Sequence, residues 1–331
     1  MEYILNKSIT RTTEHSKIND IHLDLDIPSI NGFKNFKVSG VDYKEYDSNS
    51  FESRIGLSFD KSHNIDIEVI KDNNILISYD IDDILVDNVN IKVLDNINTN
   101  ITIKYTSLKD IYHISKVNIE LGKNSKVVLN YVSLISKNSK SFIALENSLL
   151  DNSNLETNLI DLGGNIKVNN YYSNLTGEKA ISTFNNIYIV SDNDIIDMNY
   201  YTSILKPKAE GYINVSGILK DKSHKSFKGT IDFVKGSTKS IGKELERVTL
   251  LSEDSISKSM PILLCGEEDV VGAHGVSTGK IDKEKLFYMM SRGMSKKEAE
   301  KLIIKSEANI ALKNIDEDLY NEVINKIDLY I

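Results

Sequence analysis

Cysteine is nearly absent from the sequence, since Cys265 is the single one among 331 residues. One thiol cannot close a disulfide within the chain, and no CxxC pair is present to hold zinc or an iron–sulfur cluster unaided. These absences indicate a reducing, cytoplasmic compartment. We interpret Cys265 as a small buried apolar residue, which is a common setting for an unpaired cysteine.

Long apolar runs are also missing. No stretch approaches 18 apolar residues, and the first residues hold no apolar segment of signal-peptide length, so we expect no membrane association and no export. The formal net charge of −8 argues against nucleic acid as the main partner, because phosphate binding needs clustered Lys and Arg. Neither a GxxxxGK[ST] loop nor a GxSxG turn occurs, so we expect no ATP binding by the chain itself and no serine-hydrolase chemistry.

Proline and glycine are scarce, with 3 and 17 residues, so the organisation must be inferred from hydrophobic periodicity. Residues 1–75 are mixed, with short extended pieces and no strong helix. Residues 76–281 consist of short runs that alternate apolar and polar residues, are rich in Val, Ile, Tyr and Thr, and end in polar turns. This pattern predicts β-strands. Examples are NILISYDI, NITIKYTS, KVNIELG, KVVLNYVSLI, NNIYIV, EGYINVSGIL and FKGTIDFVKGS.

Many short strands of similar length are typical of a sandwich, a barrel or a β-solenoid. Turns recur roughly every 8 to 12 residues. They lack the Asn-Gly and Asp-Gly pairs that favour antiparallel hairpins. Both observations favour a solenoid, whose stacked coils need no strict sequence repeat. Periodicity alone leaves the sandwich open.

The period changes at about residue 282, and residues 282–331 are predicted to form a small helical domain. Asp282 can cap a helix with Leu286 and Met290 on one face, and Gly293 suits its left-handed C-terminal position. Ser295 and Glu298 then match the capping box of a second helix. That helix is expected to bury Ala299, Leu302 and Ile303, and a third helix from Asp316 to bury Leu319, Val323 and Ile327.

The most informative segment spans residues 261–294, PILLCGEEDVVGAHGVSTGKIDKEKLFYMMSRGM. It contains Cys265 and a histidine, His274, between small neighbours. A neutral imidazole in such a setting is either a metal ligand or a side chain satisfied at a turn. Spacing alone favours the second interpretation. Of the other histidines, His224 lies in a polar turn and is expected to be solvated, whereas the sequence leaves both the interior and the surface open for His113.

Residues 210–310 resemble the SufB/SufD family of iron–sulfur cluster assembly scaffolds. The family signature reads approximately Pro-x-Leu-x-Ile, then Asp-Val-x-Cys-x-His-Gly-Ala-Thr-Val-Gly, then Leu-Phe-Tyr-Leu-x-Ser-Arg-Gly. The matching residues here are Pro261, Leu263, Asp269, Val270, His274, Gly275, Gly279, Leu286, Phe287, Tyr288, Ser291, Arg292 and Gly293. Upstream, the match continues through Gly217, Asp221, Ser223, Phe227, Gly229 and Ile231.

The resemblance implies a right-handed parallel β-helix followed by a helical domain, with two protomers paired through their β-helices. It also implies that the helical domain docks the ABC-type ATPase SufC. His274 is then a candidate iron ligand at the protomer interface. The candidate docking residues are Leu286, Phe287, Tyr288, Met290, Arg292 and Met294, with Met289 beside them. We expect removal of residues 282–331 to abolish docking and to leave the β-helix folded.

One departure from the signature matters for function. The family's Cys-x-His is Gly272-Ala273-His274 here, so the thiolate that serves as soft ligand and persulfide acceptor is missing. Cys265 lies seven residues before Gly272, an odd offset that predicts opposite strand faces and no substitution. The chain is therefore expected to be a SufD-like, non-catalytic subunit. It would pair with a SufB-like protomer and SufC, with no cluster held stably by the lone chain and a transient one in the complex.

Two alternatives remain. The chain could pair with a second copy of itself and carry clusters as a homodimer. It could also be a carbohydrate-active β-helix enzyme, which would need paired carboxylates or a calcium site on one solenoid face. Asp and Glu are plentiful but scattered among the turns, which disfavours the enzyme.

Overall fold

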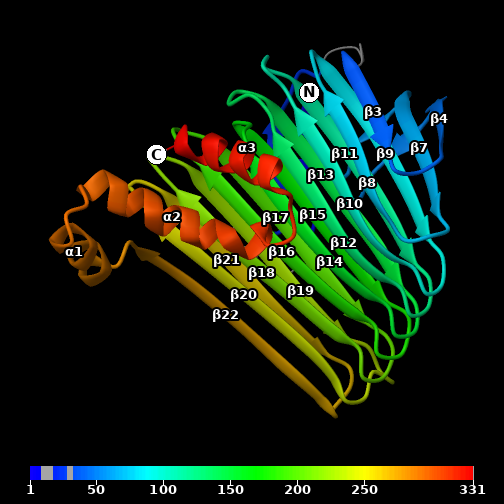
Figure 1. Ribbon diagram of the computed structural model, residues 1–331. Coiled ribbons are helices and arrows are strands. Elements are labelled where there is room, and N and C mark those ends of the chain that lie inside the picture. Colours follow the sequence, from blue (N-terminus) through cyan, green and yellow to red (C-terminus); the bar gives the residue numbers. More distant parts are fainter. Residues whose placement is uncertain (9–17, 28–32, 331) are drawn as a thin grey trace.

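The computed structural model describes residues 1–8, 18–27 and 33–330 and shows a parallel β-solenoid with three helices at the C-terminus (Figure 1). Two long sheets of nine strands each face one another. Within each sheet, every strand from β7 (Ser62–Val69) onward pairs in parallel with the strand one coil further along the chain. The predicted solenoid is thus confirmed over the sandwich, because sandwich strands pair antiparallel.

The strands of the two sheets alternate along the chain. Sheet I contains β3 (Asn35–Ser39), β8 (Asn73–Asp80), β10 (Asn98–Thr106), β12 (Lys126–Leu134), β14 (Asn154–Leu162), β16 (Ile181–Val190), β18 (Glu210–Leu219), β20 (Ser240–Leu250) and β22 (Val270–Lys280). Sheet II contains β4 (Tyr43–Ser48), β7 (Ser62–Val69), β9 (Ile84–Val93), β11 (Tyr112–Leu121), β13 (Lys140–Leu149), β15 (Ile166–Leu175), β17 (Ile195–Ile204), β19 (His224–Phe233) and β21 (Ile256–Cys265).

The described N-terminal residues close one end of the solenoid and cover part of the outer face of sheet II. β3 and β4 pair antiparallel with β8 and β7, the first strands of the parallel stack. Parallel stacking therefore begins at Ser62, within the residues whose sequence pattern is mixed. Two small antiparallel pairs complete the region, β1 (Glu2–Leu5) with β2 (Ile21–Asp24) and β5 (Phe51–Glu52) with β6 (Ser58–Phe59).

A buried polar cluster holds the first residues against sheet II. The Lys228 ammonium donates to the backbone oxygen of Asn6 at 3.0 Å and to Oδ1 of Asp197 at 2.8 Å. The Asn6 amide also donates to Oδ1 of Asp197, at 2.6 Å. All three residues are buried, so the cluster excludes water and fixes the start of the chain on β17 and β19.

The corners of the coils are built by residues that tolerate the left-handed backbone region. Asn96, Asn124 and Asn152 have φ of 63°, 57° and 56°, a conformation that Asn adopts more readily than most residues. The Asn124 amide donates to the Asn96 side-chain oxygen, 28 residues earlier, at 3.1 Å. The backbone N–H of Asn96 donates to Lys123 of the following coil, and that of Asn124 to Asp151. Each corner therefore bonds to the next, which sets the length of a coil.

Alternate residues of each strand fill the space between the sheets. Tyr79, Tyr105 and Tyr131 form an aromatic stack there, with ring centroids 5.1 and 5.0 Å apart. Further along the same interior, Gly217 leaves room for the ring of Tyr188 on the adjacent strand. A Cβ atom added at Gly217 would lie 2.0 Å from Cζ of Tyr188.

We therefore predict that Gly217→Ala destabilises the fold by about 1–3 kcal/mol, because the buried Tyr188 ring must move in a closely packed core. Gly279→Ala is the matched control, since an added Cβ there meets no atom within 4 Å. Thermal denaturation of both variants checks the prediction. Equal melting temperatures for the two would show that the ring has room to move.

The helices are α1 (Lys283–Ser291), α2 (Lys296–Leu312) and α3 (Glu317–Asp328). The predicted caps are confirmed. Asp282 accepts from the first turn of α1, Ser295 and Glu298 form the capping box of α2, and Gly293 has φ of 99°. No helix in the described part of the chain has both the length and the apolar character that a bilayer span requires.

Helices α2 and α3 lie on the outer face of sheet I (Figure 1). The predicted face of α3 is confirmed, with Leu319, Val323 and Ile327 buried, and Ala299 of α2 is buried as predicted. The prediction for Leu302 is wrong, since this side chain is 48% exposed. The side of α2 that is buried is the side that packs on sheet I. The buried residues of α2 are Ala299, Ile304, Ala308, Ala311 and Leu312.

Candidate functional site

The last strand of sheet I carries His274. β22 pairs with β20 on one side, and within the described residues its other edge pairs with no strand. His274 is opposite Glu244 in the register of the two strands, so both side chains leave the sheet on the same side. His274 is exposed, and no further coil covers β22 in the part of the chain that the structure describes.

Glu244 faces the solenoid interior below His274. Its residue surface is 2% exposed, and neither carboxyl oxygen has a hydrogen-bond partner. The carboxyl occupies the space that Gly229 leaves on β19, since a Cβ at Gly229 would lie 2.3 Å from the carboxyl carbon. Burial, together with the negative charge of Glu246, raises the pKa of Glu244 to about 8.

The neighbouring charges are already paired. The Lys225 ammonium lies 2.5 Å from Oε1 of Glu246 and donates to Oγ of Ser259 at 2.7 Å. Oγ of Ser259 in turn donates to Oε2 of Glu246 at 2.5 Å. Burial lowers the pKa of Lys225, and the adjacent Glu246 opposes that shift. Glu244 therefore stands beside a satisfied ion pair without belonging to it.

The alternation of residues in β20 would have allowed the burial of Glu244 to be predicted from the sequence. In β20, Glu244 and Glu246 alternate with Lys243, Leu245 and Arg247, and they share the phase of the apolar Val248. A carboxyl group an even number of residues from a core valine in one strand lies on the same face as that valine, which predicts that it is buried. The sequence prediction missed this signal because it judged the acidic residues by their number and scatter rather than by their phase.

Two predictions about Cys265 are wrong. The residue is exposed rather than buried. Its register partner is Phe233, an interior residue, and a Cβ at Gly272 would also lie near Phe233, at 3.2 Å from its ring. Both positions therefore face the same interior space, because a turn separates β21 from β22 and the parity rule holds only within one strand. Cys265 is the last residue of β21. His274 lies on the next strand, β22, four residues or about 13 Å from its start, so the two side chains are well separated along the strands.

The other histidines differ in burial according to their positions in the strands. His113 lies in the interior, where Nε2 is 3.1 Å from Oδ1 of the buried Asp87. His224 is exposed at the start of β19, in agreement with the prediction. His15 lies outside the described residues. Thus His274 is the exposed histidine of the signature segment.

Helix α1 has no buried residue. Phe287 and Tyr288 are 73% and 59% exposed, and Met290 and Met294 are exposed as well. Leu286 is half-buried, while the exposed Arg292 lies over the ring of Tyr288, 5.3 Å from its centroid. Large apolar side chains gathered on one short exposed helix are typical of a protein-binding surface.

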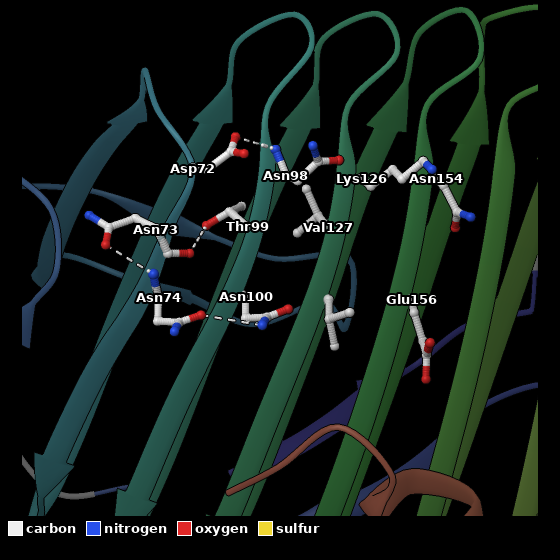
Figure 2. A pocket seen from close by; sticks show the side chains of 11 residues that line it. Asp72, Asn73, Asn74, Asn98, Thr99, Asn100, Lys126, Val127, Asn154 and Glu156 are labelled. Atoms are coloured by element: carbon white, nitrogen blue, oxygen red, sulfur yellow. Dashed lines mark hydrogen bonds between the residues drawn. The ribbon is translucent and has the colours of Figure 1, made fainter.

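A polar groove of about 600 Å³ lies on the outer face of sheet I. Figure 2 shows that its two acidic residues, Asp72 and Glu156, come from opposite ends of the row of strands. Oδ1 of Asp72 accepts from the backbone N–H of Asn98 at 2.8 Å, and Oε1 of Glu156 accepts from the amide of Asn314 at 2.9 Å. Both carboxylates thus hold hydrogen bonds within the chain.

No cluster of three or more His, Cys, Asp or Glu side chains suited to a metal ion occurs in the part of the chain that the structure describes. His274 and Glu244 are thus at most two of the ligands that an ion needs. Any complete coordination sphere at this end of the solenoid must draw on water or on another molecule.

Comparison with known proteins agrees with the fold and the signature. A family model described as "SUF system FeS cluster assembly, SufBD core domain" matches residues 77–307. The chain is 39% identical over 108 residues to the iron–sulfur cluster assembly protein SufD of Bacillus subtilis, covering 32% of this chain and 25% of that protein. It is 25% identical over 228 residues to SufD of Escherichia coli, covering 67% of this chain and 53% of that protein.

An iron–sulfur cluster assembly SufBD family protein of Pyrococcus horikoshii is 26% identical over 155 residues, which cover 47% of this chain and 34% of that protein. The matched segments thus span about a quarter to a half of these curated relatives. The family model covers more than two thirds of the chain and includes Glu244, His274 and α1. The chain belongs to the SufB/SufD family of iron–sulfur cluster assembly proteins and is close to its SufD members.

Proposed function

We propose that the chain is a SufD-like, non-catalytic subunit of a cytoplasmic Suf scaffold that pairs with a SufB-like protomer and binds the ATPase SufC. The observation that carries this proposal is the position of His274 on an exposed final strand, at the place where the family signature puts its histidine. The cluster is cargo, formed transiently between protomers.

The free edge of β22 supports pairing with a second protomer. An unpaired edge offers a row of backbone N–H and C=O groups that another strand can satisfy. β22 is 11 residues long, contains no proline and carries one charged residue, Lys280. Proline and charged side chains, which usually protect a strand edge from pairing, are therefore scarce in β22. This is expected of a strand that pairs with another chain.

The residues present explain why the lone chain should not keep a cluster. His274 supplies one imidazole, and the single thiol of the chain, Cys265, lies at the end of β21, across the turn and four residues of β22 from it. Iron–sulfur clusters are held mainly by cysteine thiolates, so a SufB-like partner would have to supply them. In this arrangement, His274 contributes a ligand or positions one at the junction.

Helix α1 is the proposed SufC-binding surface, with Phe287, Tyr288 and Met290 as its exposed apolar side chains. Methionine suits such contacts because its side chain adapts to a partner's shape. Helices α2 and α3 are less available, since their buried faces pack on sheet I. Helix α2 packs against α1, which lies at the end of the molecule near β22 (Figure 1).

The test is co-expression with a SufB-like protein and SufC from the same source. We expect a complex of the three chains that acquires iron–sulfur absorbance on reconstitution with iron, sulfide and thiol. His274→Ala should lower cluster yield at least severalfold and leave the complex intact, because the edge of β22 is unchanged. His224→Ala, at another exposed histidine, is the control and should behave as wild type.

Two results would contradict the proposal. One is failure of the three chains to associate. The other is a stable cluster on the chain alone, together with a dimeric mass by light scattering, which would favour the self-pairing scaffold. Normal cluster yield from His274→Ala in an intact complex would restrict the histidine to a structural role.

A further inference from the structure

Helix α1 and the turn after it hold half of the methionines of the chain. The sequence contains six methionines, and three of them are Met289, Met290 and Met294. The backbone oxygens of Met289 and Met290 accept from the N–H groups of Arg292 and Gly293, so these two methionines lie in the last turn of α1. Met294 follows directly after the turn. The sequence therefore gathers three thioethers at one end of a short helix.

These methionines are open to solvent, in contrast to those of the β-solenoid. Met290 and Met294 are 43% and 38% exposed, and Met289 is half-buried. Met198 and Met260 lie in strands of sheet II and are 0% and 7% exposed. A reagent that attacks sulfur from solvent therefore reaches the methionines at the end of α1 and leaves the two in the strands intact.

A peroxide is the class of reagent that changes such a site. Hydrogen peroxide transfers one oxygen atom to a methionine sulfur: the O–O bond breaks, an S–O bond forms, the sulfur loses two electrons, and the peroxide is reduced to water. The product, methionine sulfoxide, is polar and chiral where the thioether was apolar, and methionine sulfoxide reductases restore the thioether. The reaction thus converts an apolar contact surface reversibly into a polar one.

We propose that Met290 and Met294, with Met289 beside them, form an oxidation-sensitive modification site that controls the docking of SufC on α1. This inference rests on the proposed function, because it assigns a regulation to the same surface. In the reduced chain, the flexible thioethers adapt to the apolar surface of the ATPase. In the oxidised chain, each sulfoxide oxygen must give up its water to enter the interface, which weakens binding.

Two other oxidisable groups are exposed, and both can be told apart from this site. Met1 is 84% exposed but belongs to the N-terminal region, which packs on sheet II. Cys265 is an exposed thiol. Dithiothreitol reverses the first oxidation products of a thiol, whereas methionine sulfoxide needs its own reductases. The reagent that restores binding therefore identifies the sulfur that was oxidised.

The experiment treats the full chain with hydrogen peroxide, removes the reagent, and then measures binding of untreated SufC. Peptide mass spectrometry should find one added oxygen atom on Met290 and on Met294, and none on Met198 or Met260. The dissociation constant for SufC should rise by at least about tenfold, because polar groups then enter an apolar contact. Methionine sulfoxide reductases should restore the original affinity, and dithiothreitol should not.

A triple variant provides the second measurement. Met289→Leu, Met290→Leu and Met294→Leu together keep the apolar volume but cannot form sulfoxides, so this chain should bind SufC equally before and after peroxide. Met260→Leu is the matched control at a buried methionine, and it should lose binding after peroxide as wild type does. If circular dichroism shows that the triple variant is unfolded, or if it does not bind SufC before peroxide, the reductase treatment of wild type decides.

Three results would overturn the inference. They are peroxide treatment that leaves Met290 and Met294 unmodified, unchanged binding of SufC when both are fully oxidised, and recovery of binding with dithiothreitol alone. Failure of the untreated chain to bind SufC would instead contradict the proposed function, and the switch with it. Binding before oxidation together with loss after it would support both.

Discussion

A chain that ends at residue 281 is expected to aggregate rather than to leave a folded β-solenoid. Helices α2 and α3 cover an apolar stripe on the outer face of sheet I. The seven buried sheet residues of this stripe are Val132, Leu134, Ile160, Leu162, Ile187, Ile189 and Ile218. Burying each such side chain contributes about 1.5–3 kcal/mol, so the stripe accounts for on the order of 10 kcal/mol. This is comparable to the whole stability of many domains.

Size-exclusion chromatography and thermal denaturation of the truncated chain check this expectation. We expect most of it in the void volume, with a melting temperature at least about 10 °C lower in any monomer that remains. A monomer that melts like the full chain would show that the helices are dispensable for folding. Because we expect truncation to unfold the solenoid, removal of residues 282–331 is not a clean test of SufC docking. Docking needs a different experiment.

That experiment changes α1 alone. Phe287→Ala with Tyr288→Ala removes two side chains that are mostly exposed, so the melting temperature should stay within about 1 °C of wild type. If α1 docks SufC, the double variant should lose pull-down of the ATPase. Retained pull-down at unchanged stability would place the docking surface elsewhere.

Glu244→Gln is expected to stabilise the chain by about 3 kcal/mol at pH 7 in the presence of a chelator. Glu244 lies opposite His274 in the strand register, and burial together with the charge of Glu246, itself paired with Lys225, raises the pKa of its carboxyl to about 8 in the folded chain. In the unfolded chain this pKa is about 4.5, so at pH 7 folding must take up a proton. Glutamine has nearly the same shape and removes that requirement.

The pH dependence follows from the sign of the shift. Because the folded pKa lies above the unfolded one, the stability contributed by protonated Glu244 is fully present below about pH 4.5 and is lost as pH rises through about 8. The two proteins should therefore melt together near pH 4 and diverge by about 5 °C or more at pH 7. A Glu244→Gln variant that melts below wild type at pH 7 would show that the carboxylate is held by a favourable contact.

The local structure of the C-terminal region was predictable because its signals act over one turn of helix. Asp282, Ser295 and Glu298 cap their helices through contacts three residues apart, and Gly293 adopts its left-handed conformation for steric reasons alone. The strands of residues 76–281 were predictable in the same way, from alternation within each run. Leu302 was misplaced because sheet I, far away in the sequence, determines which side of α2 is covered.

The candidate site was only half predictable. His274 stood out through its place in the signature, whereas Glu244 lies 30 residues earlier and meets it only through the register of β20 and β22. The error about Cys265 has the same origin. An odd or even separation in the sequence predicts the side-chain direction only within one strand. A turn separates Cys265 in β21 from Gly272 in β22, and both positions face the interior of the solenoid.

The sequence by itself determined the short alternating strands, the polar corners, the helix caps and the family, because each depends on contacts between residues close in the chain or on a fixed order of residues. The tertiary structure alone decided that α2 and α3 belong to the core and that an unpartnered carboxyl group lies opposite His274. These features arise from pairs of residues about one coil or more apart, whose meeting is set by the accumulated register of the stack and not by any local pattern.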